Sequence, residues 1–200
     1  MTEYQPPAAS LGRLGTITQK LAAAAKVEFP FDTHPKAVLQ LASGELFYES
    51  RLTLDTDGSV FASQDPTGDS QTSIQNADGT PVDADAIPYF VLPEKNFYQQ
   101  FGIRLGDIAA VIYRDKIAFA VFADEYGDQQ TEEQLGEGSI ALHRLLGHET
   151  ITADGRLINE GIDSGVITIV FPGSGREDDP QTPAKINEIG KKLFKALGGN

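Results

Sequence analysis

Two apolar runs in the middle of the chain are its clearest structural signal. Residues 107–113 and 116–123 are separated only by Arg114 and Asp115, a spacing that predicts a β-hairpin. Successive positions in both runs are apolar, a pattern typical of strands that are covered on both faces. We therefore expect this hairpin to lie in the centre of a sheet or barrel.

Three further strands are predicted around the hairpin. Apolar and polar residues alternate over 46–54, which indicates a strand with one buried face and one solvated face. A short strand is predicted over 87–92, bounded by Pro88 and Pro93. The prolines favour an edge position, because proline donates no ladder hydrogen bond. The last predicted strand covers 166–171. A polar segment over 64–85 is longer than most loops, which favours a functional loop or several very short strands.

Helices are predicted at both ends of the chain and in one connection. Apolar residues recur at helical spacing over 11–27, at Leu14, Ile17, Leu21 and Ala25. Ser139 suits the N-cap of a short helix over 140–146. A final helix begins after the cap residue Thr182, with Pro183 at its first position, and stops at Gly198.

These elements together predict a β-rich α+β fold. We expect a small, partly closed β-barrel of about six strands, with peripheral helices at the N- and C-termini. Residues 1–10 are polar and contain two prolines, so they are expected to form a flexible tail. Residues 11–200 are expected to form a single domain.

Charge narrows the class of partner. The chain has 29 acidic and 16 basic residues and a formal net charge of −13, which disfavours nucleic acid and bare membrane and favours a cationic partner. Residues 1–9 carry no basic segment, so no conventional leader is predicted. No apolar run approaches the ~18 residues that a membrane-spanning helix needs.

Several kinds of chemistry are disfavoured by the residues themselves. Cysteine is absent, which removes a thiolate zinc site and a thiol nucleophile. His143 and His148 are five positions apart, which is not the spacing of two ligands on one helix face. The sequence from Asp55 to Gly58 begins like a calcium loop, but it lacks the glutamate at the twelfth position, so a turn is the favoured interpretation. We predict no metal and no cofactor.

Carboxylates are therefore the plentiful chemical groups, and a pair of them suffices for glycoside hydrolysis. Asp124 ends the apolar run over 119–123, where its side chain is expected at the rim of the sheet. Glu137 lies between Gly136 and Gly138, where little side-chain bulk would block a polymer. These two residues are the best candidates for a catalytic pair, although most acidic residues of such a chain are solvated surface.

Six short motifs occur in an order that resembles the chitosanases of glycoside hydrolase family 75. They are Asp-Thr-Asp-Gly at 55–58, Gln-Thr-Ser at 71–73, the segment 82–93, the segment 105–113, Phe-Ala-Asp at 122–124 and Leu-Gly-Glu-Gly-Ser at 135–139. The resemblance covers about residues 46–146. By analogy with other polysaccharide-cleaving proteins, the barrel is expected to be of the double-psi kind.

The resemblance implies endo-hydrolysis of β-1,4-linked glucosamine polymers such as chitosan, with inversion at the anomeric carbon and without a cofactor. The aspartate and glutamate of the family match Asp124 and Glu137. Two departures matter. The family usually follows its aspartate with a tight glycine-proline turn, whereas Glu125, Tyr126 and Gly127 here lead into a longer acidic connection. Members usually carry a leader, so the location of this chain stays open between leaderless export and the cytoplasm, although the substrate implies extracellular action.

Roles follow as hypotheses. Glu137 is expected to be the general acid and Asp124 the base that orients water, although the two roles could be exchanged. Asp55, Asp57 and Asp128, with Glu132 and Glu133 beside them, are candidates for binding the ammonium groups of glucosamine units. Tyr89 and Tyr126 are candidates for stacking on sugar rings. We expect a monomer whose partner is a cationic polysaccharide.

Three other readings stay open. A lytic protein acting on peptidoglycan would use the same carboxyl pair on N-acetylated substrate. An exported antibacterial effector would combine an extracellular substrate with a missing leader. A non-catalytic polysaccharide-binding module would bind chitosan without forming product.

Overall fold

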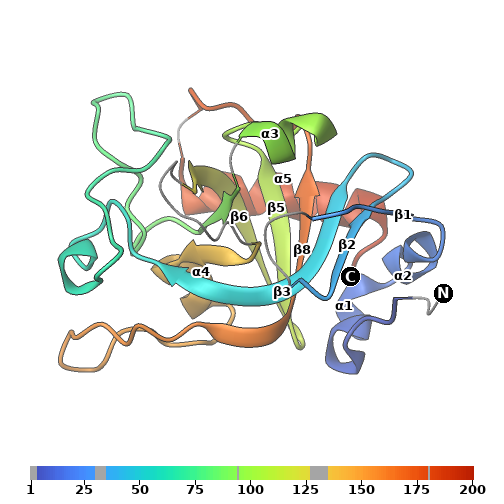
Figure 1. Ribbon diagram of the computed structural model, residues 1–200, viewed down its shortest axis with the longest axis horizontal. Helices are drawn as coiled ribbons and strands as arrows, with labels where there is room; N and C mark the ends of the chain where they lie inside the picture. The colour runs from blue at the N-terminus through green and yellow to red at the C-terminus, as the bar shows by residue number, and fades with distance from the viewer. Residues whose placement is uncertain (1–3, 30–34, 94, 127–134, 180) are drawn as a thin grey trace.

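Six strands close into a β-barrel in the computed structural model of the protein, which describes residues 4–29, 35–93, 95–126, 135–179 and 181–200 (Figure 1). The strands are β3 (Leu46–Asp55), β4 (Tyr89–Leu92), β5 (Ile108–Tyr113), β6 (Lys116–Glu125), β7 (Glu137–Ser139) and β8 (Ile162–Phe171). Their order is β3-β7-β4-β6-β5-β8, and β3 also pairs with β8, which completes the ring. The prediction of a β-rich six-stranded barrel is confirmed, and the barrel is closed rather than partly open.

Short elements surround this ring. Two strands, β1 (Ala25–Lys26) and β2 (Ala37–Gln40), extend the sheet from β3. The helices are α1 (Leu11–Leu14), α2 (Ile17–Leu21), α3 (Lys95–Tyr98), α4 (Ile140–Leu145) and α5 (Pro183–Leu197), with 3₁₀ turns at Ala8–Ser10, Ala62–Gln64 and Gln99–Phe101. No helix within the described ranges is long and apolar enough to cross a bilayer.

The predicted hairpin is confirmed as β5 and β6, which pair antiparallel around Arg114 and Asp115. Alternate residues of β5 pack into two different cores: Ile108, Ala110 and Ile112 into one, Ala109 and Val111 into the other. The first core includes residues of α5, which packs against β5 and β6, so it lies outside the barrel wall. The second core fills the barrel. Burial of both strand faces explains why the runs are apolar at every position from 108 to 112 and from 117 to 123.

The two capped helices are also confirmed. The Ser139 side chain accepts a hydrogen bond from the Leu142 backbone N–H at the start of α4. Thr182 does the same for α5 through the Lys185 backbone N–H, and Gly198 ends that helix in the left-handed conformation. Local sequence is sufficient at both places, because a cap involves residues only three positions apart.

The single N-terminal helix expected over 11–27 is wrong. Leu14, Ile17 and Leu21 are buried as the pattern requires, but Gly15 has φ 53° and separates α1 from α2. A Cβ atom at Gly15 would lie 2.5 Å from the Gly198 carbonyl oxygen, so the C-terminal end of the chain packs directly against this break. Residues 25–26 form β1 instead of the last helical turn.

Two strand predictions also need correction. The strand β4 is not an edge, because it pairs with β6 on one side and β7 on the other. Its flanking prolines lie outside the paired residues Tyr89–Leu92, so they remove no ladder hydrogen bond. In β3 both faces are buried from Leu46 to Ser50. Glu49 is only 3% exposed, because the Tyr4 hydroxyl covers it and donates a hydrogen bond to its carboxylate.

Parallel pairing brings three strand segments from distant parts of the sequence side by side. β7 runs parallel to β3 and antiparallel to β4, while β4 runs parallel to β6. The C-terminal ends of β3 and β6 and the short strand β7 therefore meet around β4, and each carries an acidic residue.

Candidate active site

Asp124 and Glu137 lie on the two strands that flank β4. Val91 of β4 pairs with Glu137 of β7 on one side and with Asp124 of β6 on the other. Directly paired residues of neighbouring strands project from the same face of a sheet. The two carboxyl side chains therefore point into the same space, one strand apart from each other.

A β-bulge determines which face Asp124 occupies. Phe90 pairs with Phe122, but Val91 pairs with Asp124, so Ala123 is the extra residue on β6. Without the bulge Ala123 would face Val91, and Asp124 would project from the opposite side of the sheet. The bulge thus turns the carboxyl toward Glu137.

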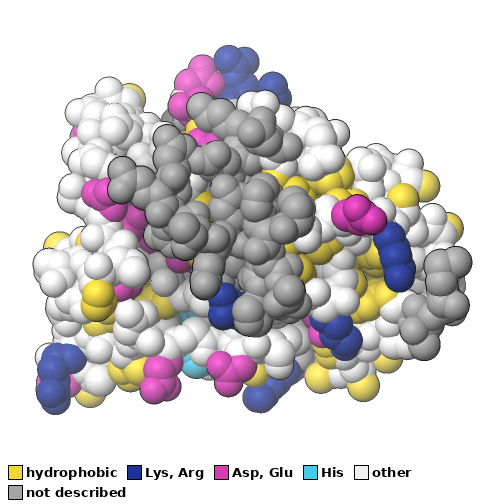
Figure 2. Space-filling model, in the orientation of Figure 1, with side chains coloured by type: hydrophobic (Ala, Val, Ile, Leu, Met, Phe, Trp, Pro, Cys, Tyr) yellow, Lys and Arg dark blue, Asp and Glu magenta, His cyan; other side chains and the backbone are white. Residues whose placement is uncertain are grey.

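Asp55 and Asp57 approach from the end of β3. Thr53 pairs with Glu137, and Asp55, two residues further on, projects from the same face. Carboxylate oxygens of Asp55, Asp57 and Asp124 lie within 4.8 Å of one another. With Tyr126 and Glu137 they line a cleft of about 300 Å³. On the face shown in Figure 2, several acidic side chains lie in the left half of the view.

Hydrogen bonds fix the orientation of these carboxyls. Asp124 Oδ1 accepts hydrogen bonds from the Ser73 hydroxyl (2.6 Å), the Ser73 backbone N–H (3.0 Å) and the Glu125 backbone N–H (2.8 Å). Asp55 Oδ1 accepts from the Asp57 backbone N–H at 2.8 Å, and Asp57 Oδ1 accepts from the Asp69 backbone N–H at 2.6 Å.

Burial and mutual repulsion raise the pKa of four carboxyls in the cleft, those of Asp55, Asp57, Asp124 and Glu137. Burial is the main cause that raises the pKa of Glu137, to about 8. The charges of Asp57 and Asp124 also raise this pKa, whereas a hydrogen bond from Tyr126 lowers it. Burial also raises the pKa of Asp124, and the bonds from Ser73 oppose this. The pKa of Asp57 rises to about 7 through burial, and that of Asp55 lies well above its usual value, through burial and then the charge of Glu137. The site thus contains Glu137, whose pKa of about 8 keeps it protonated at neutral pH, beside Asp124, whose hydrogen bonds oppose the effect of burial.

The predicted substrate-binding residues lie in different positions relative to the cleft. Asp55 and Asp57 lie beside the candidate pair. Tyr89 is 0% exposed and offers no ring face to a sugar, so its expected stacking role is wrong; its hydroxyl instead donates to the Asp57 carbonyl at 3.2 Å. Tyr126 is 6% exposed and hydrogen-bonds to Glu137. Asp128, like Glu132 and Glu133, lies outside the described residues.

Sequence reasoning assigned no role at this site to two residues, Ser73 and Asp65. Ser73 was quoted only as part of the Gln-Thr-Ser motif, yet it holds Asp124. Asp65 lines the cleft and accepts hydrogen bonds from Thr67 and Asn159. The only signal for either was the unusual length of the polar segment over 64–85, in which both lie. Within the described range 35–93, the segment contains no strand and forms one isolated bridge, Gln75 with Pro81, and it brings Asp65 and Ser73 to the cleft.

Asp55, Asp57 and Asp124 are also the residues that could hold a metal ion, because their oxygens are close enough to share one. Hard cations such as Ca²⁺ prefer such oxygen ligands. All three carboxyls have pKa values raised by burial and by neighbouring negative charge, and no Lys or Arg side chain among the described residues forms an ion pair with them. The geometry alone therefore gives a carboxyl cluster that serves proton transfer or cation binding.

Comparison with known proteins identifies the family. No curated protein of known function matches the chain. A family model described as "Fungal chitosanase of glycosyl hydrolase group 75" matches residues 52–197, which is most of the chain and includes Asp55, Asp124 and Glu137. This confirms the resemblance drawn from the ordered motifs and makes the protein a glycoside hydrolase of chitosanase type. The chain belongs to the fungal chitosanase family, group 75 of the glycosyl hydrolases.

Proposed function

We propose that this glycoside hydrolase cleaves chitosan within the chain, with inversion, using Glu137 as general acid and Asp124 as general base. The observation that carries the proposal is the pairing of both residues with Val91. Neighbouring strands lie about 4.8 Å apart, so two residues one strand apart have backbones roughly 9.6 Å from each other. Inverting glycosidases separate their carboxyls by about 6.5–9.5 Å to admit a water molecule.

The protonation states support these roles. The pKa of Glu137 is about 8, so this carboxyl holds a proton at neutral pH and can donate it to the leaving glycosidic oxygen. Asp124 accepts three hydrogen bonds on one oxygen, which favours its ionised form despite burial. Its other oxygen is left to accept a proton from water.

The reaction balances with these two groups. Asp124 removes a proton from water as the water oxygen bonds to the anomeric carbon. The bond from that carbon to the glycosidic oxygen breaks, and Glu137 gives its proton to this oxygen. Each carboxyl ends in the other's starting state, and exchange with solvent restores both.

Asp55 and Asp57 suit a cationic substrate. Their pKa values are raised by burial and by nearby carboxylates, so an ammonium group in the cleft would neutralise repulsion already present there. We infer that they bind an amino group next to the scissile bond and favour glucosamine over N-acetylglucosamine. Asp128 remains a candidate for the same role.

The test is hydrolysis of chitosan by variants of the pair. Asp124→Asn and Glu137→Gln should each reduce the release of reducing ends at least 1,000-fold, roughly the loss of general acid–base assistance, while melting near the wild-type temperature. Wild-type protein should lower the viscosity of chitosan early, as an endo-enzyme does, and NMR should show the inverted anomer first. Full activity in either variant, a retained anomer, or action only on N-acetylated glycan would contradict the proposal.

A further inference from the structure

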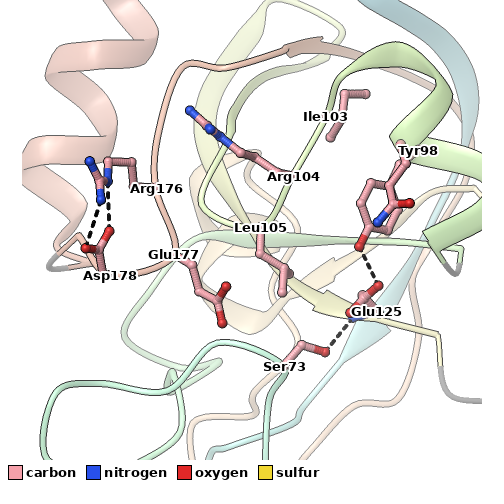
Figure 3. Close-up of a pocket in the computed structure, with 10 residues that line it drawn as sticks. Ser73, Tyr98, Ile103, Arg104, Leu105, Glu125, Arg176, Glu177 and Asp178 are labelled. Carbon is pink, nitrogen blue, oxygen red and sulfur yellow. Dashed lines mark hydrogen bonds and ion pairs between the residues drawn. The ribbon is translucent and has the colours of Figure 1, made fainter.

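A second cavity of about 770 Å³ adjoins the catalytic cleft (Figure 3). Glu125 lines both cavities, and Ser73, which lines the second, holds the candidate base Asp124. The second cavity therefore lies on the Asp124 side of the site. We refer to it as the Glu177 pocket, after the carboxylate that Figure 3 shows on its wall.

The catalytic cleft is small for a polymer-cleaving enzyme. At about 300 Å³ it lies at the lower end of the range for small-ligand pockets, about 300–1,000 Å³. An endo-hydrolase must bind several sugar units on both sides of the bond that it cleaves. The adjoining cavity supplies additional space in line with Asp124.

Side chains in the Glu177 pocket match an amino sugar. Ile103 and Leu105 provide apolar surface for the C–H face of a pyranose ring. Glu125 is oriented by the Tyr98 hydroxyl, which donates to its Oε1 at 2.7 Å. The Glu177 carboxylate lies near Leu105 and Ser73 in Figure 3. Among the described residues Glu177 forms no ion pair, whereas the neighbouring Asp178 forms one with Arg176 at 2.9 Å.

Hydrogen bonds to Asp107 hold the segment that leads to Glu177 in place. Asp107 is fully buried and accepts hydrogen bonds from the backbone N–H groups of Arg104, Gly173 and Gly175, at 2.9–3.0 Å. A Cβ atom at Gly175 would lie 1.9 Å from the Gly106 carbonyl oxygen, so the two backbones are in direct contact. The segment that contains Gly173 and Gly175 is therefore fastened to the start of β5. This fixes the two sides of the pocket relative to the barrel.

Arg104 lines the same pocket and opposes a cation. Its guanidinium extends from the wall in Figure 3, and no ion pair involving it occurs among the described residues. An ammonium group near Arg104 is repelled, while the neutral N-acetyl group is not. The pocket thus contains an attractive carboxylate and a repulsive guanidinium for the same ligand.

We propose that the Glu177 pocket is a further sugar-binding subsite on the Asp124 side of the cleavage point, where Glu177 and Glu125 bind ammonium groups and Arg104 weakens the binding of fully deacetylated chains. The proposal rests on the proposed function, because it extends the substrate groove of that enzyme.

Two substitutions with opposite expected effects test it. With long glucosamine oligomers at low salt, Glu177→Gln should raise KM about 2- to 5-fold and leave kcat nearly unchanged, the size of one exposed charge pair. Arg104→Gln should lower KM by a similar factor. Both effects should disappear near 0.5 M salt, where exposed charges are screened. Glu188→Gln and Lys192→Gln on the exposed side of α5 make the same net-charge changes and serve as matched controls.

The outcomes separate this inference from the proposed function. If Glu177→Gln has the same KM as Glu188→Gln, and Arg104→Gln the same KM as Lys192→Gln, the proposed subsite is wrong. If wild-type protein leaves chitosan intact, or Asp124→Asn remains active, the proposed function fails. Calorimetric titration of glucosamine oligomers into the wild type, Glu177→Gln and Glu188→Gln then tests the pocket alone, and an unchanged Kd for Glu177→Gln overturns it.

Discussion

Asp124 and Glu137 lie on opposite sides of one strand, each directly paired with Val91 of β4. Their separation is therefore determined by the registers of three strands. It does not depend on the connection between them, although Glu137 follows Asp124 by 13 positions. The register therefore places both residues on one face, with a single strand between them, whatever the length of the connection from one to the other.

The alkaline limit of activity should respond in opposite directions to two neighbours of Glu137. The acid must be protonated, so activity should fall as the pH rises through its pKa of about 8. Tyr126→Phe removes a hydrogen bond that lowers this pKa and should move the limit up. Asp57→Asn removes a charge that raises it and should move the limit down. Each shift should be about 0.5–1 pH unit, measured in kcat against pH on chitosan oligomers.

If the alkaline limit moves in the same direction in Tyr126→Phe and in Asp57→Asn, Glu137 is not the group that titrates there. An alkaline limit that is unchanged in both variants would assign that limit to another residue. Asp163→Asn on the exposed surface of β8 is the control for a general change of charge.

The acidic limit should depend on Ser73. Its hydroxyl donates to Asp124 at 2.6 Å and so lowers the pKa of a carboxyl that burial raises. Ser73→Ala should move the acidic limit of kcat about 1 pH unit upward, because a hydrogen bond to a charged group stabilises it by roughly 1.5–3 kcal/mol and the backbone bond remains. Ser70→Ala, on the exposed part of the same loop, should leave the profile unchanged. An unchanged acidic limit in Ser73→Ala would remove Asp124 from the role of base.

Local sequence was sufficient for the parts of the fold that depend on neighbouring residues. The hairpin of β5 and β6 and the caps Ser139 and Thr182 follow from residues a few positions apart. The strand β4 was misplaced at an edge because its two partners come from elsewhere in the chain. Asp124 could be found at the end of an apolar run, but the bulge at Ala123 that orients it could not.

The hydrogen bonds that complete the site also could not be predicted from the sequence. Ser73 and Asp124 are 51 positions apart, and no periodic pattern connects them. Tyr89 was a candidate for stacking on sugar rings, and the strand that contains it was expected at an edge. Its true position inside the sheet buries the ring completely.

Stability should depend on pH through Asp55. Its pKa in the folded protein is well above the ordinary value of an aspartate, through burial and then the charge of Glu137. A raised pKa means that the folded state keeps a proton which the unfolded chain releases, so this contribution is present below about pH 4 and is lost as the pH rises through the folded pKa. Asp55→Asn should therefore raise the melting temperature more at pH 8 than at pH 4.5.

Thermal melting from pH 4.5 to 9 measures this difference directly. The Asn side chain retains an oxygen for the Asp57 N–H, so the turn is preserved. Asp163→Asn should show no such dependence on pH. A melting temperature of Asp55→Asn that stays below the wild-type value at every pH would show that the carboxylate stabilises the fold.

His143 joins β3 and β7, two of the three strands that carry the acidic residues of the site. It is fully buried, and its ring nitrogens lie 3.0 Å from the Ser139 carbonyl oxygen of β7 and 3.1 Å from the Leu52 carbonyl oxygen of β3. A neutral imidazole has one N–H, so it donates to one of these carbonyls, whereas an imidazolium donates to both. Burial lowers the pKa of His143, and the two carbonyls oppose this.

His143→Phe should therefore disturb both stability and turnover. The ring volume is kept, but the buried carbonyl that accepts the imidazole N–H loses its donor, which should lower the free energy of unfolding by about 1–3 kcal/mol. Because β7 carries Glu137, kcat should fall while KM changes little. His148→Gln, a partly exposed histidine beyond the end of α4, is the control. Denaturant unfolding and steady-state kinetics measure the two effects, and a destabilised His143→Phe with normal kcat would limit His143 to a role in folding.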